Sequence, residues 1–206
     1  IANYNACRWA GNCEGPCLNT AGRGRFDATQ TARAKRTVYK LLEPDQFKAK
    51  MIMEVGALER KAKRKGMKPC VRPNGTTDES YEWLIDEMPH IQFYDYTKSY
   101  KKLVKNKRKN YHLTFSYDGP SNWRECRLAL LNGYNVAIVF SDGPEKWPKT
   151  LRGVRVINGD DNDLRFKDPQ PAVIGLTAKG EAKNDTSGFV WSLNLGKEKR
   201  SNGYIY

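Results

Sequence analysis

The 206-residue chain contains no apolar run long enough to span a bilayer and no apolar, signal-like start. We therefore expect a soluble protein, and the length allows one domain with a substantial hydrophobic core. A P-loop, a dinucleotide-binding glycine fingerprint, an internal repeat and a low-complexity tract are all missing. The five cysteines, an odd number in a lysine-rich chain, argue against a disulfide framework and favour a reducing compartment.

Acidic residues are scarce relative to basic ones: 23 Asp and Glu stand against 36 Lys and Arg, a formal net charge of +13. The basic excess is concentrated at residues 23–36, 61–68 and 98–110, with tyrosines interleaved. Such clusters favour a polyanionic partner, nucleic acid, and DNA before RNA, although solvated helix faces are the alternative. The expected phosphate contacts are Arg23, Arg25, Arg33, Lys35, Arg36, Lys61, Lys63, Arg64, Lys101, Lys102, Lys105, Lys107, Arg108 and Lys109.

Three of the cysteines, Cys7, Cys13 and Cys17, lie within eleven residues near the start of the chain. Three thiolates this close in sequence can share one metal ion or iron–sulfur cluster and leave a coordination position open for a substrate or cofactor. A structural zinc ion completed by His90, His112 or a carboxylate is one alternative, and unpaired structural thiols are another.

Two amphipathic helices are expected first, at 28–42 with Asp27 or Thr29 as N-cap, and at 44–65 with Pro44 in its first turn. After Gly66, short β-branched and aromatic runs alternate with short helical runs, a pattern typical of βα units and a mainly parallel sheet. The expected strands cover residues 69–75, 91–97, 111–117, 135–140, 154–159 and 172–178, and the helices between them cover 79–88, 99–106 and 121–133.

This alternation predicts the α/β class, as a partial or compact (β/α) barrel in preference to an open doubly wound sheet, with both early helices packed on it. We expect one domain over 1–206. Its parts are the cysteine loop and basic helices at 1–66, the βα units at 67–180, and a C-terminal loop or hairpin at 181–206 that closes over the sheet. Cys70 and Cys126 lie in apolar segments and are expected to be core residues.

Polar residues gather where the expected strands end. In parallel α/β architectures functional groups collect at this rim, so we expect a cup of carboxylates, hydroxyls and lysines that faces the cysteines. Helix caps and turns are the alternative reading of each residue taken singly. The acid/base candidates are Asp78, Asp95, Lys98 and Asp118.

The run ACRWAGNCEGPCLNTAGRGRF, the block FYDYTK and the block INGDDNDLRF, with further matching blocks between them, resemble a bacteriophage protein family of unknown function related to gene product 88. That family is similar to small, diverged relatives of radical S-adenosylmethionine enzymes, although the present C-x5-C-x3-C spacing is wider than their usual C-x3-C-x2-C. The resemblance implies a phage protein in the cytoplasm of the infected bacterial cell.

The resemblance also implies a [4Fe–4S] cluster on Cys7, Cys13 and Cys17, with zinc as the alternative metal, and S-adenosylmethionine at the open iron position. It implies cofactor-binding roles for Asn74, Gly75, Thr76, Ser116, Asn158, Gly159, Asp160 and Asp161.

Three functions are compatible with these observations. The first is an iron–sulfur, radical S-adenosylmethionine-like enzyme that modifies nucleic acid or nucleotides. The second is a non-redox, transglycosylase-like enzyme that modifies DNA, with Asp78 or Asp95 as the nucleophile on a flipped-out nucleotide. The third is a zinc-stapled DNA-binding or host-takeover protein without catalysis. We rank them in this order.

Overall fold

The computed structural model describes residues 4–192, which fold around an eight-stranded, mostly parallel sheet. The strand order is β1-β2-β3-β4-β7-β6-β5, β8 pairs with β4, and β5 alone runs antiparallel to its neighbour, β6. The strands are β1 (Cys70–Val71), β2 (Gln92–Thr97), β3 (Tyr111–Ser116), β4 (Val136–Phe140), β5 (Thr150–Leu151), β6 (Val154–Asn158), β7 (Val173–Thr177) and β8 (Val190–Trp191).

The sheet is open, because among the described residues β1 pairs only with β2 and β5 pairs only with β6. The parallel α/β class predicted from the sequence is confirmed. A barrel is not, since the two edge strands do not meet.

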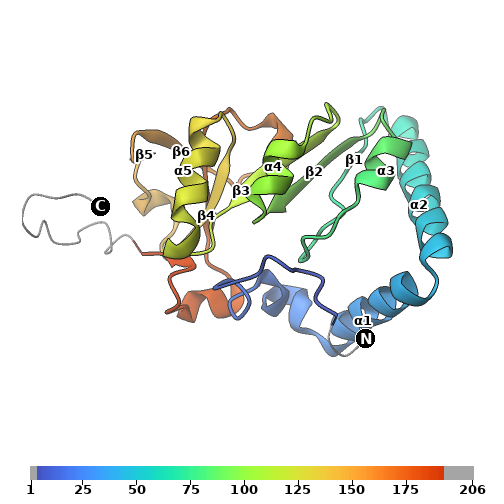
Figure 1. Ribbon diagram of the computed structural model, residues 1–206, viewed down its shortest axis with the longest axis horizontal. Helices are drawn as coiled ribbons and strands as arrows, with labels where there is room; N and C mark the ends of the chain where they lie inside the picture. The colour runs from blue at the N-terminus through green and yellow to red at the C-terminus, as the bar shows by residue number, and fades with distance from the viewer. Residues whose placement is uncertain (1–3, 193–206) are drawn as a thin grey trace, which may run out of the picture.

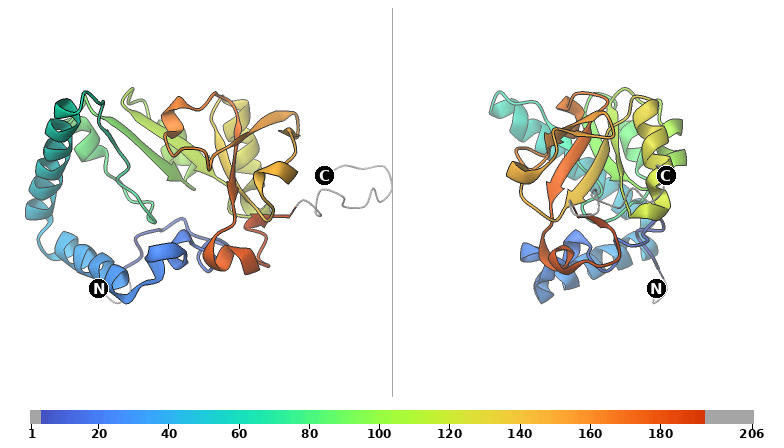
Figure 2. Two further views of the ribbon diagram at one scale, coloured as in Figure 1. Left: turned by 180° about the vertical axis from the view of Figure 1, so that it is seen from behind. Right: turned by 90° about the vertical axis from the view of Figure 1, so that its left-hand side faces the viewer.

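Three short helices connect the first four strands and cover one face of the sheet (Figure 1). They are α3 (Glu82–Glu87), α4 (Tyr100–Lys105) and α5 (Trp123–Leu131). The segment between β6 and β7, which contains the 3-10 turn η5 (Arg165–Lys167), contacts β2 and β3 and lies on the opposite face (Figure 2, left). Within residues 4–192, the sheet therefore has one face covered by helices and a second face covered by loops and short 3-10 turns.

Alternation along the strands divides aromatic side chains between these two faces. Phe93, Phe115 and Phe140 are completely buried and pack with Leu84 and Ile85 of α3 on the helix-covered face. Full burial of a side chain of this size contributes about 1.5–3 kcal/mol. Neighbouring positions along a strand point the other way, toward the loop-covered face.

The two early helices, α1 (Asp27–Leu42) and α2 (Pro44–Arg64), differ in how they pack. α2 flanks the β1 side of the sheet and buries Val55 and Ala62, whereas α1 buries no residue fully and runs below the carboxyl ends of the strands (Figure 1). The prediction that both helices pack on the sheet therefore holds for α2 only. The N-cap prediction is wrong: Phe26 occupies that position without a side-chain hydrogen bond, and Asp27 already belongs to the first turn.

The C-terminal part contains a strand that the sequence pattern did not predict. β3 pairs with β4 only at Phe115–Ser116 and Val136–Ala137, so β4 extends past the end of β3. β8 pairs in parallel with the remaining half of β4, at Val139 and Phe140. The described residues after 180 thus form a 3-10 turn and a parallel strand, not a hairpin; the rest of the expected hairpin, residues 193–206, lies outside the described residues.

Two smaller expectations can be compared directly. Cys126 is completely buried in α5, as expected for a core residue, and Cys70 is partly buried in β1. No helix within residues 4–192 is both long enough and apolar enough to cross a membrane.

Candidate active site

A cavity of about 480 Å³ lies at the carboxyl ends of the parallel strands, which we call the carboxyl edge of the sheet. Its walls include Tyr96 and Val139, which belong to the loop-covered face of the sheet. We call it the main cavity. Its lining comprises residues 7, 13 and 16–18 of the cysteine loop; 72, 75–78, 96–98 and 116; 137, 139, 159, 160, 162 and 163; and 176, 177, 179, 182 and 189.

All three N-terminal cysteines line the main cavity. The backbone N–H of Cys13 donates a hydrogen bond to Asp118 Oδ1, at 2.8 Å, which attaches the loop to the end of β3. Gly11 allows this close approach, because a Cβ there would lie 2.3 Å from Asp118 Oδ2. Cys13 also packs with Phe189 and Val190 at the C-terminal end of the described chain. The cysteine loop is therefore fixed by two distant segments.

Burial favours the neutral form of the Cys7 and Cys13 thiols. Burial raises the pKa of Cys13 to about 11 and also raises the pKa of Cys7. The ammonium of Lys98 acts in the opposite direction on both thiols, without cancelling the effect of burial. A cationic centre at the loop would favour the thiolates, since ionised sulfur is the form that binds metal.

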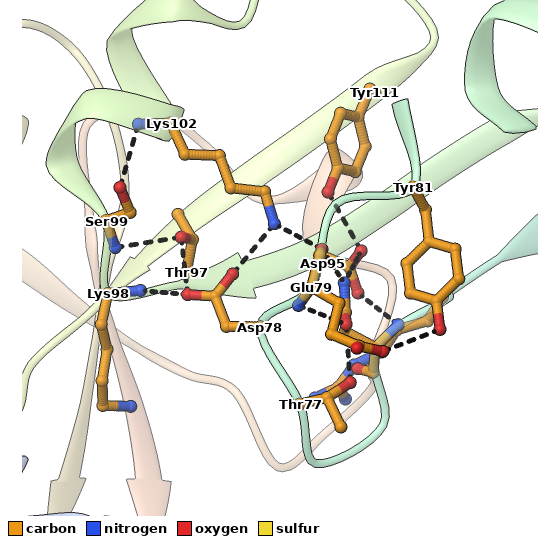
Figure 3. A network of polar contacts seen from close by, with 12 residues as sticks. Thr77, Asp78, Glu79, Tyr81, Asp95, Thr97, Lys98, Ser99, Lys102 and Tyr111 are labelled. Carbon is orange, nitrogen blue, oxygen red and sulfur yellow. Dashed lines mark hydrogen bonds and ion pairs between the residues drawn. The ribbon is translucent and has the colours of Figure 1, made fainter. Parts of the chain in front are cut away.

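Asp95 does not line the cavity. Its carboxylate holds the loop that follows β1 through hydrogen bonds to Asn74. The backbone N–H and the side-chain amide of Asn74 each donate to its carboxylate at 3.0 Å, and the Tyr111 hydroxyl donates at 3.1 Å (Figure 3). Asn74 in turn accepts hydrogen bonds from Thr77 and Glu79, which fixes the loop. Burial raises the pKa of Asp95 to about 6 despite these donors.

Asp78 lines the main cavity, but both of its carboxylate oxygens are already bonded (Figure 3). One oxygen accepts from the Thr97 hydroxyl at 2.8 Å and from the backbone N–H of Lys98 at 2.9 Å. The other accepts from Lys102 Nζ at 2.9 Å. Asp78 therefore ties the β1 loop to the end of β2 and to α4.

Two of the cations that line the cavity are paired with carboxylates. Arg72 lies 3.2 Å from Asp163, and Lys179 lies 2.8 Å from Asp160. Burial opposes ionisation of Asp160, but hydrogen bonds from Lys179 and Thr177 outweigh it and hold the pKa of that carboxyl below its usual range. These two pairs place charges of both signs in the cavity lining, in the segments that follow β1, β6 and β7.

Lys98 differs from these cations. Its Nζ donates to Ser116 Oγ at 3.2 Å and lies 5.8 Å from the centre of the Phe189 ring. Among the described residues no carboxylate lies within ion-pair distance of it. Lys98 is thus a cation of the cavity lining that has no ion-pair partner in the described part of the chain.

The floor of the cavity is apolar, with Tyr96, Val139 and Leu176 among its residues. The guanidinium of Arg72 lies over the Tyr96 ring, at 4.6 Å from its centre. A cavity with an apolar floor and charged rim fits a ligand of small-cofactor or nucleotide size that has a flat apolar part and polar substituents.

The loop after β6 is anchored by a buried arginine that the sequence analysis missed. Arg165 is fully buried, donates to the backbone carbonyls of Gly159 and Asn162, and lies 3.2 Å from Asp168. Gly159 has no room for a side chain, because a Cβ would lie 2.5 Å from Ile174. This packing sets the position of Asp160 and Asp163 at the cavity.

The predicted metal ligands share one cavity but do not form a closed site. Within residues 4–192, no three His, Cys, Asp or Glu side chains lie close enough together to hold a metal ion. Neither His90 nor His112 lines the cavity. His90 lies 3.2 Å from Glu59, and burial lowers the pKa of His112 to about 4. The metal site on Cys7, Cys13 and Cys17 stays a prediction.

The structure divides the other predicted site residues. Of the four acid/base candidates, Asp78 and Lys98 line the cavity, whereas Asp95 and Asp118 support loops around it. Of the eight predicted cofactor-binding residues, five line it, namely Gly75, Thr76, Ser116, Gly159 and Asp160. The other three do not: Asn74 is buried beside Asp95, and Asn158 donates to Asp161.

The basic clusters lie at two different edges of the sheet. Residues 61–68 and 105–109 directly precede β1 and β3, so they lie at the amino ends of the strands, which we call the amino edge (Figure 1). Residues 23–36 belong to the segment below the carboxyl edge. Two expected phosphate contacts are already paired within the chain, Lys102 with Asp78 and Arg108 with Asp86.

Two residues that line the main cavity, Arg72 and Phe189, were not predicted from the sequence. Arg72 follows a two-residue strand and could have been found from its place at a strand end. Phe189 reaches the cavity from the segment before β8, and nothing in its local sequence indicates that position.

A family model described as gene product 88 matches residues 1–193. No curated protein and no solved structure matches the chain significantly.

Proposed function

The chain belongs to the gene product 88 family, a phage-type protein family, and we propose that its main cavity is the active site of an iron–sulfur enzyme that acts on nucleic acid or nucleotides. One observation supports this most directly: three thiols separated by short intervals line the same cavity as the polar ends of the parallel strands. Cys70 and Cys126 lie elsewhere, in β1 and α5.

The donor set fits an iron–sulfur cluster in its chemistry. Three cysteines are the protein ligands of a cluster that keeps one iron position open, and such a cluster supplies electron transfer and a site for a ligand. Holding it would require the loop to bring its thiols closer together than they stand. Two hydrogen bonds hold the loop as it stands: Thr20 Oγ1 donates to the carbonyl of Cys17 at 2.8 Å, and the N–H of Cys13 donates to Asp118.

The chain's own groups then have separable roles. Lys98 and Ser116 offer donors beside the cysteines, and the backbone at Gly75 and Thr76 offers polar atoms after β1. Asp160, which stays ionised, suits the hydroxyls of a ribose. A nucleoside-containing cofactor such as S-adenosylmethionine is the proposed occupant, with its flat base over the apolar floor.

The non-redox alternative is less well supported by the geometry. It needs a carboxylate that is free to attack, but Asp78 accepts three hydrogen bonds and Asp95 lies beneath the loop outside the cavity. A DNA-binding protein stabilised by zinc would use the same cysteines. The identity of the bound metal, zinc or iron, distinguishes this alternative from the iron–sulfur enzyme.

The test is the metal and sulfide content, with an absorption spectrum, of protein purified without oxygen. We expect iron with acid-labile sulfide in the wild type and its loss in the triple variant Cys7→Ala, Cys13→Ala, Cys17→Ala. The matched control is Cys70→Ala, which removes a partly buried thiol outside the cavity and should keep the iron.

Each result has a clear meaning. Iron that the triple variant loses, while circular dichroism shows an intact fold, supports the proposal, and titration with S-adenosylmethionine then follows. Zinc in place of iron would support the DNA-binding alternative. No metal in any preparation, or iron that the triple variant retains, would refute the iron–sulfur assignment.

A further inference from the structure

A second, open cavity of about 540 Å³ lies next to the main cavity and is formed by two 3-10 turns, η1 (Leu18–Thr20) and η6 (Gly180–Asn184), with η2 (Gly22–Arg25) and the start of α1. We call it the outer groove. It is lined by Asn19, Thr20, Arg25, Gln30, Gly180, Glu181 and Lys183.

The two cavities share their walls. In η1, Leu18 lines the main cavity while Asn19 and Thr20 line the outer groove. In η6, Ala182 lines the main cavity while Glu181 and Lys183 line the outer groove. The two cavities therefore lie on two sides of the same pair of turns, and a ligand that leaves the main cavity over these turns would reach the outer groove.

The contact between the turns is built into the fold. The backbone N–H of Glu181 donates to Thr20 Oγ1 at 3.3 Å. Gly180 has φ +60, and a Cβ there would lie 2.9 Å from the Cβ of Ala21, so this position excludes larger residues. Gln30 fixes η2 by donating to the carbonyl of Gly24 at 2.6 Å. The outer groove is thus held by specific contacts along both walls.

The cations of the outer groove differ from Arg72 and Lys179 of the main cavity, which form ion pairs with carboxylates. Arg25 and Lys183 are exposed, and no carboxylate of the described residues lies within ion-pair distance of either. Arg23, Lys35 and Arg36 add exposed positive charge along the adjoining η2 and α1. Glu181 is the one carboxylate among the residues that line the groove. The groove is therefore cationic and polar, which is the chemistry that binds phosphodiesters.

From this adjacency and the charge of the groove we propose that the substrate is a single-stranded polynucleotide: one nucleotide enters the main cavity and the flanking phosphates bind Arg25 and Lys183 in the outer groove. This inference rests on the proposed function. A single strand is favoured over a duplex, because a stacked and paired base would first have to leave the helix, at a cost of a few kcal/mol. The basic residues of the amino edge then lie away from the bound strand.

The experiment measures binding of a fluorescein-labelled single-stranded DNA of mixed sequence, about 12 nucleotides long, as a function of salt concentration. For Arg25→Ala with Lys183→Ala we expect roughly tenfold weaker binding, and a salt slope smaller by about 1.4, since each phosphate contact on a single strand contributes about 0.7. The matched control, Lys61→Ala with Arg64→Ala, removes two exposed charges from the amino edge and should bind like the wild type.

Further arms distinguish the form of the ligand. Single-stranded RNA of the same sequence tests whether ribose or deoxyribose is preferred. Binding of the DNA or of the RNA that depends on Arg25 and Lys183 supports the inference. Unchanged affinity and slope in the Arg25 and Lys183 variant, an equal loss in the control, or tighter binding of duplex would overturn it. So would a free mononucleotide that binds as tightly as the strand.

Iron and sulfide are measured on the same preparations. The Arg25 and Lys183 variant should keep the metal content of the wild type, because neither residue lines the main cavity. If the Arg25 and Lys183 variant binds the strand like the wild type while its metal content is normal, the groove assignment fails and the proposed function stands. If the wild type binds the strand through these residues but contains no metal, the proposed function fails and the groove assignment stands.

Discussion

The two edges of the sheet use the same residue types in different ways. At the carboxyl edge, Asp78 and Lys102 form a nearly buried pair, and Asp95 is completely buried among donors. At the amino edge, Arg108 and Asp86 form a pair that is largely exposed. The difference shows that a charged side chain can hold a loop in place at one edge of the sheet and lie at the surface at the other.

The largest test of this comparison is Asp95→Ala. The change leaves the N–H groups of Asn74 and the hydroxyl of Tyr111 without their acceptor, in a fully buried place. We expect the free energy of unfolding to fall by about 3–5 kcal/mol, measured by chemical denaturation. Arg108→Ala, at the amino edge, should leave the denaturation midpoint nearly unchanged. Equal losses in the two variants would contradict the distinction between the edges.

The pH dependence of the free energy of unfolding gives a second test of the buried Asp95 at the carboxyl edge. Burial raises the pKa of Asp95 from 3.8 to about 6, so the folded state favours the protonated carboxyl. This contribution to stability is present below about pH 4 and is lost as the pH rises through about 6. At about 1.4 kcal/mol per pKa unit, the loss is about 3 kcal/mol at most.

The measurement compares the wild type with Asp95→Asn, which cannot titrate at this position. The stability of the wild type relative to this variant should fall between pH 4 and pH 6 and then level off. A difference that stays constant with pH would show that Asp95 titrates alike in the folded and unfolded chain.

The smallest expected effect concerns the cysteine loop. Asp118→Ala removes the acceptor of the Cys13 N–H, and we expect a loss of about 1–2 kcal/mol in the free energy of unfolding. Thiol labelling followed by mass spectrometry should show faster modification of Cys13, which is 7% exposed, and no change at the fully buried Cys126. Unchanged labelling of Cys13 would mean that contacts with Phe189 and Val190 hold the loop without Asp118.

Periodicity predicted the regular elements well because it reflects burial. α2, β2 and β4 begin and end within a residue or two of their expected bounds. It failed where the decisive contact is distant: β8 has two residues, and its strand conformation depends on pairing with β4. The N-cap of α1 failed for a local reason, since Phe26 fills the position without forming a side-chain bond.

The location of the candidate site could be predicted from the sequence, but the roles of its individual residues could not. Since parallel strands end at one edge, the sequence could bring Asp78, Lys98 and Ser116 together near the cysteines. It could not show that Asp78 is bonded on both oxygens or that Asp95 lies below the loop, because hydrogen-bond partners twenty residues away leave no spacing signal.

The pairing of β8 with β4 has a consequence for the order in which the chain assembles. The cysteine loop at the start of the chain packs against Phe189 and Val190, near the end of the described residues. During synthesis, Cys13 emerges from the ribosome long before Phe189 and Val190, the residues that cover it. The loop therefore stays uncovered on that side until the segment around β8 has been made, and the main cavity gains the wall formed by Phe189 only then.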